Sequence, residues 1–300
     1  MKITSIVLIL SFTLFIFGDP LSEIVWSHDS KDYYLYIKAG GLMGFKAVAV
    51  FEVPLFLADP LIIFSGCDVN LIKAMIRSES GFKVHAKSKT GALGVSQIVR
   101  STAKWLGLRN PYNPVWSSFA ICKYVRYLYK KFPTTEKMLW AYHDGEGKIK
   151  LGGPSKAARN YANIVLKYYN EYQRTGRLEF FKDRVYAFLS ADYFFGNDLE
   201  VKLGGALSIL GTVDFEGGYM LDSEGFKSWF VRSYLRIFHD LALIVGWSEK
   251  GWELGSSTWL DDYNLEVLST PDGPEATVYL NGLGISFRKS RIGFFYRLGF

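Results

Sequence analysis

The chain has 300 residues, of which 49% are hydrophobic, 17% are aromatic and 21% are charged. A disordered chain combines few apolar residues with a high net charge, so this composition excludes an intrinsically disordered protein. The formal net charge is +6, but the basic residues are scattered and form no run. We therefore expect no nucleic-acid partner.

The charge distribution and the length both predict two domains. Residues 1–179 contain 24 Lys and Arg against 13 Asp and Glu, whereas residues 180–300 contain 11 against 16. The net charge of these two parts is therefore +11 and −5, with the change of sign near Glu179. A chain of this length commonly forms two domains, so we place a boundary there.

The first residues are typical of a secretory signal peptide. Lys2 is followed by an apolar run that ends at Phe17, and the helix-breaking pair Asp19-Pro20 comes next. The run is shorter than the roughly 20 residues that a membrane-spanning helix needs. We therefore predict a signal peptide at residues 1–18 and export to the periplasm.

The two cysteines, Cys67 and Cys122, leave two interpretations open. Export permits a disulfide between them. Two buried, unpaired thiols are equally compatible with the sequence.

Residues 19–66 form an N-terminal segment with a candidate β-hairpin. Within residues 33–57, two apolar stretches flank the turn-forming pair Gly40-Gly41. A leading helix is the alternative interpretation of these stretches. If the stretches are strands of the second domain, the helical region that follows them is an insertion into a sheet.

Residues 67–179 are predicted to form an all-helical domain. Asp68 suits a helix N-cap, and apolar residues then recur at helical spacing through Ile76, with Glu79 beside the same face. Proline and glycine separate the further helical stretches, which are residues 102–106, 116–132, 135–142 and 155–172.

Residues 180–300 are predicted to form an antiparallel β-meander, since apolar residues alternate with polar ones. Eight or nine strands are expected, which predicts a barrel of eight strands, or at most ten. The expected strands are residues 185–195, 201–209, 213–221, 229–237, 241–247, 252–259, 263–268, 277–287 and 292–300. The fold class is therefore α+β: a helical domain followed by a β-barrel.

Alternation does not say which face of this sheet meets water. A transmembrane barrel directs its apolar face to lipid, whereas a soluble sandwich directs it inward. The signal peptide, the aromatic content and the terminal Phe300, which resembles the end of bacterial outer-membrane proteins, favour the membrane barrel. Eight strands would leave an interior filled by side chains, so the barrel would be an outer-membrane anchor rather than a pore.

Glu79 is the candidate catalytic residue. A carboxyl group beside an apolar helical face loses solvation, which raises its pKa and lets it hold a proton near neutral pH, as a general acid must. The alternative is a solvent-exposed glutamate at a helix end, because Gly81 terminates this helix.

Four motifs in a fixed order favour the catalytic interpretation. They are Ser78-Glu79-Ser80-Gly81, Gly91-Ala92-Leu93-Gly94-Val95-Ser96-Gln97, Ala141-Tyr142-His143-Asp144-Gly145-Glu146-Gly147 and Arg159-Asn160-Tyr161-Ala162. Together they resemble the lytic transglycosylase domain of the soluble, goose-lysozyme-like kind. That family has Glu-Ser, Gly-x-x-Gly-x-x-Gln, Ala-Tyr-Asn-x-Gly-x-Gly and Asn-Tyr-Val at these places.

The resemblance implies an enzyme that cuts peptidoglycan between N-acetylmuramic acid and N-acetylglucosamine. Glu79 would act first as the acid and then as the base, closing a 1,6-anhydro ring without consuming water. The matching positions imply that the following residues contact the substrate: Ser80, Gln97, Tyr142, His143 and Tyr161. Expected partners are peptidoglycan strands and outer-membrane lipid.

Three departures from the family pattern keep other functions open. Val95-Ser96 replaces Leu-Met, His143 replaces Asn, and Glu146 replaces Pro. The alternatives are a catalytically weakened murein-binding module and a hydrolytic lysozyme, for which Asp144 or Glu146 would be the rival carboxyl groups. The sequence has no metal-ligand spacing and no nucleotide-binding motif, so no cofactor is expected.

Overall fold

The computed structural model describes residues 33–39, 42–194, 198–221, 227–238, 240–260, 263–271, 273–280, 283–288 and 291–299. The predicted signal peptide and Phe300 lie outside these residues. The chain divides into two compact units. One is the helical unit, residues 52–184 with 209–212, and the other is the sheet unit, which contains the remaining residues.

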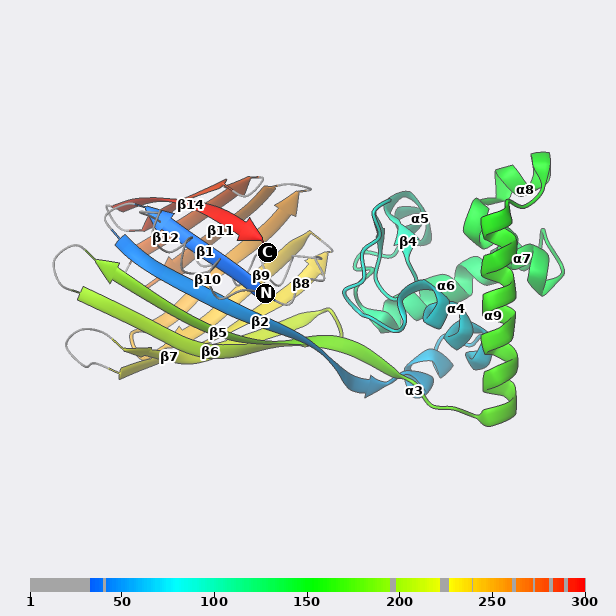
Figure 1. Ribbon diagram of the computed structural model, residues 1–300, viewed down its shortest axis with the longest axis horizontal. Coiled ribbons are helices and arrows are strands. Elements are labelled where there is room, and N and C mark those ends of the chain that lie inside the picture. Colours follow the sequence, from blue (N-terminus) through cyan, green and yellow to red (C-terminus); the bar gives the residue numbers. More distant parts are fainter. Residues whose placement is uncertain are drawn as a thin grey trace, which may run out of the picture. The chain divides into compact units, whose positions relative to one another are not determined.

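The sheet unit consists of long antiparallel strands (Figure 1). The N-terminal strands are β1 (Tyr33–Ala39) and β2 (Leu42–Leu57). The C-terminal strands are β5 (Phe180–Phe194), β6 (Asp198–Ile209), β7 (Val213–Leu221), β8 (Lys227–Phe238), β9 (Leu241–Ser248), β10 (Gly251–Leu260), β11 (Tyr263–Thr270), β12 (Gly273–Leu280), β13 (Leu283–Arg288) and β14 (Arg291–Gly299).

The strands are arranged as a closed barrel in the order β1-β14-β13-β12-β11-β10-β9-β8-β7-β6-β5-β2. Strand β1 closes the sheet, because it pairs with the C-terminal strand β14 on one side and with β2 on the other. The candidate hairpin at residues 33–57 is therefore part of the sheet, and the helical unit is inserted between β2 and β5.

The expected number of eight to ten strands is wrong, because the barrel contains twelve strands within the described residues. Two of them come from the N-terminal hairpin. Another arises because residues 277–287, expected as one strand, are divided between β12 and β13. Asn281-Gly282 stands between these strands, and this pair is typical of a two-residue hairpin turn.

Many large apolar side chains of the sheet are exposed, and several of its charged side chains are buried. Along β9, Leu243, Val245 and Trp247 are exposed, while the residues between them are buried. Asp214 and Arg236 are buried and form an ion pair, with 3.0 Å between Arg236 Nη2 and Asp214 Oδ2. Arg232 and Glu253 form a second pair. The apolar face is thus the outer face of this sheet.

The helical unit contains α3 (Ala58–Ile63), α4 (Val69–Ser80), α5 (Arg100–Leu106), α6 (Pro114–Tyr129), α7 (Thr135–Asp144), α8 (Glu146–Gly152) and α9 (Lys156–Thr175), with the short strands β3 (Ala92–Leu93) and β4 (Ile98–Val99). It starts earlier than the predicted residue 67, because α3 belongs to it. Helix α8 was not predicted, because its glycines suggested a break. No helix of the described residues is long and apolar enough to cross a membrane.

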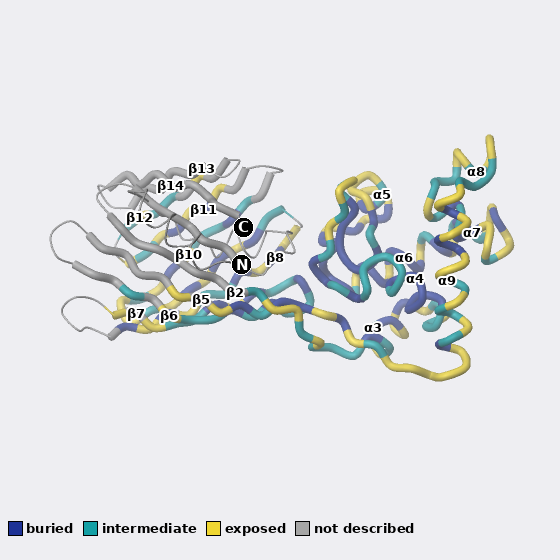
Figure 2. Tube along the Cα trace, in the orientation of Figure 1, coloured by how far each residue is buried: buried dark blue, intermediate teal, exposed yellow. Residues whose placement is uncertain are grey.

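Helix α4 lies in the core of this unit and positions Glu79. Asp68 caps its first turn by accepting hydrogen bonds from the amides of Asn70 and Leu71, and Gly81 ends it in the left-handed conformation. Residues 71–76 are buried, and α4 packs against α3, α6 and α9. Figure 2 shows α4 as mostly buried, in contrast to α8, which has no buried residue.

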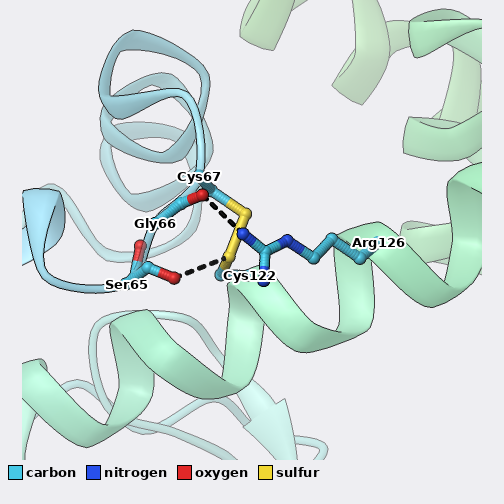
Figure 3. Close-up of a disulfide and its surroundings, with 5 residues drawn as sticks. All are labelled: Ser65, Gly66, Cys67, Cys122 and Arg126. Carbon is cyan, nitrogen blue, oxygen red and sulfur yellow. Dashed lines mark hydrogen bonds between the residues drawn. A yellow bond between two sulfur atoms is a disulfide. The ribbon is translucent and has the colours of Figure 1, made fainter.

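A disulfide joins Cys67 to Cys122, which excludes the alternative of two unpaired thiols (Figure 3). It ties the segment before α4 to the middle of α6. Arg126, one turn further along α6, donates from Nη2 to the carbonyl oxygen of Gly66 at 2.5 Å. The segment that leads into α4 is therefore fixed to α6 by a covalent bond and a hydrogen bond.

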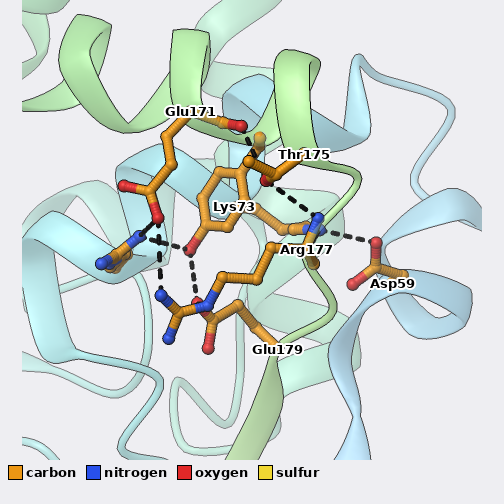
Figure 4. Close-up of polar contacts among 8 residues, drawn as sticks. Asp59, Lys73, Glu171, Thr175, Arg177 and Glu179 are labelled. Atoms are coloured by element: carbon orange, nitrogen blue, oxygen red, sulfur yellow. Dashed lines mark hydrogen bonds and ion pairs between the residues drawn. The ribbon is translucent and has the colours of Figure 1, made fainter.

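A polar cluster holds together the first and last residues of the helical unit (Figure 4). Lys73 is buried in α4, and its Nζ donates to Asp59 Oδ2 at 2.7 Å and to the carbonyl oxygen of Arg177 at 2.5 Å. The amide of Ala58 also donates to the carbonyl oxygen of Glu179 at 2.7 Å. The chain therefore enters and leaves the helical unit at neighbouring positions, which these hydrogen bonds hold together.

Candidate active site

Glu79 lies in the last turn of α4 and is half-buried. Burial raises its pKa to about 7, since the charged form loses solvation, and the Tyr161 hydroxyl opposes part of this shift. A large fraction of Glu79 therefore holds a proton at neutral pH. The carboxyl group can act as a general acid and, once deprotonated, as a base.

Two tyrosines from other helices lie beside this carboxyl group. Tyr142 of α7 and Tyr161 of α9 have nearly parallel rings, with centroids 6.2 Å apart and an interplanar angle of 7°. Burial raises the pKa of both hydroxyls well above the usual value, and the negative charge of Glu79 raises each of them further. Both hydroxyls therefore stay protonated and can donate hydrogen bonds at any physiological pH.

The second motif forms a loop that is hydrogen-bonded to the first and third motifs. Ser80 donates from its hydroxyl to the carbonyl oxygen of Val95 at 2.9 Å. Tyr142 donates from its hydroxyl to the carbonyl oxygen of Ser96 at 2.7 Å. These two bonds place the residues after Gly94 next to Glu79, so three motifs distant in sequence form one site.

Gln97 lies in this loop but donates to the backbone. Its Nε2 donates to the carbonyl oxygens of Gly94 and Ala86, at 2.8 and 3.2 Å. Its φ of 47° is also in the left-handed region, which is uncommon for a residue other than glycine. The amide group thus stabilises the loop, and a sugar contact through its NH₂ would have to replace one of these bonds.

Gly94 is required by a close backbone approach, and its replacement gives a testable prediction. A Cβ at Gly94 would lie 1.9 Å from the carbonyl oxygen of Pro111, whereas a Cβ at Gly91 would meet nothing within 4 Å. Both glycines have positive φ. We expect Gly94→Ala to lower the free energy of unfolding by about 3 kcal/mol or more, and Gly91→Ala by only about 1 to 2 kcal/mol.

Urea unfolding of the two glycine variants and the parent chain tests this difference. Equal losses in both variants would show that the backbone conformation, rather than the contact with Pro111, sets the cost.

The two rival carboxyl groups, Asp144 and Glu146, are paired with lysines, and Asp144 is also hydrogen-bonded to His143. Burial alone would raise the pKa of Asp144, but hydrogen bonds from Ser155, His143 and Lys148 hold it well below its usual range. Hydrogen bonds from Lys131, Lys150 and Tyr127 lower the pKa of Glu146 to about 2.

A group with a lowered pKa is a poor proton donor at neutral pH. Of the three carboxyl groups in the motif segments, Glu79 alone has a raised pKa. His143 is on the solvent side of the site, where its ring lies 5.2 Å from that of Tyr161.

Three further aromatic residues adjoin the site, and none of them belongs to the four sequence motifs. Tyr124 of α6 lies 5.4 Å from Tyr142 between ring centroids, and Trp105 of α5 lies 4.9 Å from Tyr127. The spacing of Tyr124 and Tyr127 by three residues on one helix was the available signal, because it places both on the same face. Within the described residues, no group of three or more His, Cys, Asp or Glu side chains is suited to hold a metal ion.

The family model described as the Transglycosylase SLT domain matches residues 65–165. This segment contains Glu79, Gln97, Tyr142 and Tyr161. The match covers about a third of the chain, and it assigns the helical unit to transglycosylase domains at the level of the family.

Two curated phage proteins are similar to part of this chain. The peptidoglycan transglycosylase gp16 of Escherichia phage T7 is 38% identical over 102 residues, which are 31% of this chain and 8% of that protein. A transglycosylase of Enterobacteria phage PRD1 is 28% identical over 103 residues, which are 34% of this chain and 38% of that protein. The chain thus spans only a small part of the first relative and less than half of the second.

Two solved structures are also similar to this chain. An inactive mutant of the lytic transglycosylase Slt from Pseudomonas aeruginosa has 20% identity and a TM-score of 0.34, covering 39% of this chain and 23% of that one. The 70 kDa soluble lytic transglycosylase from Escherichia coli has 24% identity and a TM-score of 0.35, covering 39% of this chain and 24% of that one.

Proposed function

We propose that this protein is a peptidoglycan lytic transglycosylase in which Glu79 is the single acid and base. The observation that carries the proposal is a half-buried carboxyl group with a pKa of about 7, set beside the stacked rings of Tyr142 and Tyr161. The match of residues 65–165 to a transglycosylase domain supports the choice of substrate.

The proposed reaction proceeds in two proton transfers. Protonated Glu79 donates to the glycosidic oxygen, so that the bond from this oxygen to C1 of N-acetylmuramic acid breaks and N-acetylglucosamine leaves with a free hydroxyl. The Glu79 carboxylate then takes the proton of the muramyl 6-hydroxyl, whose oxygen bonds to C1. Glu79 ends protonated, and no water is consumed.

Mass spectrometry of muropeptides released from purified peptidoglycan by the full chain tests this proposal. We expect products that end in 1,6-anhydro-N-acetylmuramic acid. Products with reducing ends would overturn it in favour of a hydrolytic lysozyme. Binding of peptidoglycan without release of products would overturn it in favour of a murein-binding module.

The pKa of Glu79 also predicts the pH dependence of the reaction. Because the first step needs the protonated carboxyl group, kcat/KM should be constant well below pH 7. Above this value it should fall about tenfold for each pH unit, as the protonated fraction decreases. Initial rates of peptidoglycan solubilisation between about pH 3 and 9 measure this profile, and a midpoint near pH 4.5 would contradict the role of burial.

We further propose that the sheet unit lies in a lipid bilayer and anchors the protein to the outer membrane. Leu243 and Val245 are exposed on its outer face, whereas Asp214 and Arg236 are buried and paired on the inner one. This distribution is opposite to that of a soluble protein but agrees with the requirements of a membrane barrel.

Three tryptophans at one edge of the outer face support the membrane proposal. Trp229, Trp247 and Trp252 are exposed at neighbouring strand ends of β8, β9 and β10. The rings of Trp247 and Trp252 stack with centroids 5.3 Å apart, and that of Trp229 lies 5.7 Å from Trp247. Aromatic side chains gather in this way where a membrane meets water.

Fractionation of cell envelopes tests the anchor. We expect the protein to stay with the membrane in high salt and in carbonate, and to migrate faster on gels before heating than after it. Release by salt alone would show that the sheet is not embedded in lipid.

A further inference from the structure

A continuous row of aromatic rings leads from Glu79 to the surface of the helical unit. Tyr142 lies beside Glu79 and is followed by Tyr124, whose ring centroid is 5.4 Å away. Tyr124 is followed by Tyr127 at 6.3 Å, and Trp105 closes the row at 4.9 Å from Tyr127. Trp105 also lies 6.0 Å from Tyr124, so its ring contacts both tyrosines of α6.

The outer end of this row is accessible to solvent. Trp105 is 53% exposed, and Tyr124 and Tyr127 are partly exposed. Exposed apolar side chains that adjoin one another, rather than a single exposed ring, can mark a ligand-binding surface. The row thus offers apolar ring surface outside the site that Glu79 and its two neighbours form.

Polar contacts hold these rings in place. The Tyr127 hydroxyl donates to Glu146 Oε2 at 2.8 Å, and Lys131 Nζ lies 4.1 Å from the centre of the Tyr127 ring. Lys123 of α6 donates from Nζ to the carbonyl oxygen of Leu106 at 3.1 Å, which ties the end of α5, next to Trp105, to α6. The rings are therefore positioned before any ligand arrives, which lowers the entropic cost of binding.

We propose that Trp105, Tyr124 and Tyr127 form an outer subsite for a chain of β-1,4-linked N-acetylhexosamines. The faces of pyranose rings carry C–H groups, which pack on aromatic rings, while hydroxyls and acetamido groups remain in water or bind polar groups. A row that starts at the candidate acid and ends in solvent binds an extended glycan rather than a single sugar. This inference rests on the proposed function, since it assigns the same substrate to the same site.

The test measures oligosaccharide binding to the full chain carrying Glu79→Gln, so that cleavage does not interfere. The probes are the disaccharide and the hexasaccharide of β-1,4-linked N-acetylglucosamine, measured by calorimetry. We expect Trp105→Ala to weaken hexasaccharide binding about tenfold and to leave disaccharide binding unchanged. Trp105→Phe should retain most of the affinity, since it keeps a ring at this position.

Trp116→Ala is the matched control. Trp116 is 62% exposed on the same helical unit, but its ring contact is with Phe119, and neither residue belongs to the row. We expect this variant to bind both oligosaccharides like the parent. If the alanine variant folds poorly, Trp105→Gln repeats the test, because it removes the ring but places a polar side chain at this exposed position.

The subsite is overturned if Trp105→Ala and Trp116→Ala bind the hexasaccharide equally, or if the parent does not prefer it to the disaccharide. The proposed function is tested separately, by the products of the chain with Glu79 intact. A loss of binding in Trp105→Ala together with no cleavage would preserve the subsite and reject the enzyme. Anhydro products from the chain with Glu79 intact, together with equal hexasaccharide binding by Trp105→Ala and Trp116→Ala, would support the enzyme and reject the subsite.

Discussion

We expect Glu79→Gln to lower the rate of peptidoglycan solubilisation by about 10³-fold or more, because in the proposed reaction a single group supplies both the acid and the base. Glutamine keeps the shape of the side chain but neither donates nor accepts a proton in the reaction. Its amide replaces a carboxyl group that is about half neutral at pH 7, so we expect the packing around Tyr142 and Tyr161 to stay intact. The measurement is release of soluble muropeptides per enzyme over time.

Glu136→Gln is the matched control for this variant. Glu136 is exposed in the first turn of α7, the helix that carries Tyr142, and it has no contact with the site. We expect a rate close to that of the parent. If Glu146 were the acid instead, Glu146→Gln would lose as much activity as we expect of Glu79→Gln, and this result would refute the assignment.

Thermal unfolding separates a catalytic from a structural effect at Glu79. The folded pKa of about 7 exceeds the usual value of 4.5, so the folded state binds the proton more tightly than the unfolded chain does. The stability that the neutral form provides is present below pH 4.5 and is lost as the pH rises through 7. At pH 8, Glu79→Gln should therefore unfold at the same temperature as the parent or at a higher one.

Replacing both cysteines by serine lowers the free energy of unfolding of the helical unit by about 4 kcal/mol. The Cys67–Cys122 bridge closes a loop with a sequence separation of 55, and its loss gives the unfolded chain more conformations. The loop contains α4 and the loop of the second motif, so activity at elevated temperature should fall along with stability. Thermal melts followed by circular dichroism measure the change.

A reductant provides the control for the disulfide. It should lower the unfolding temperature of the parent to that of Cys67→Ser with Cys122→Ser, and it should leave the double variant unchanged. An equal unfolding temperature of the parent with and without reductant would show that the bridge contributes little to stability.

The helix that carries Glu79, α4, was predictable because its determinants are local. The N-cap Asp68, the buried apolar face and the terminal Gly81 all lie within one short segment, and the structure has each in its predicted role. The raised pKa of Glu79 follows from the same pattern, since a carboxyl group beside an apolar face loses solvation.

Other features depend on contacts between residues that are distant in the sequence. The pKa of Glu146 is lowered by Lys150 of its own helix but most of all by Lys131, which lies in the turn after α6. The bridge between Cys67 and Cys122 joins two separate segments. The row from Trp105 to Tyr142 combines three helices. The spacing of residues along one segment can place a side chain on a given face of that segment. It does not identify the side chain of another segment that will contact it.

The sequence by itself determined that residues 180–300 are strands, because a period of two specifies a strand that has two unlike faces. It left undecided which face is outside and whether β1 and β2 belong to the same sheet. Only the tertiary structure decided both, through the pairing of β1 with β14 and the burial of Asp214 and Arg236. The physical reason is that apolar and polar residues alternate in the same way whether the apolar face points inward or outward. One face becomes the interior only when the sheet closes.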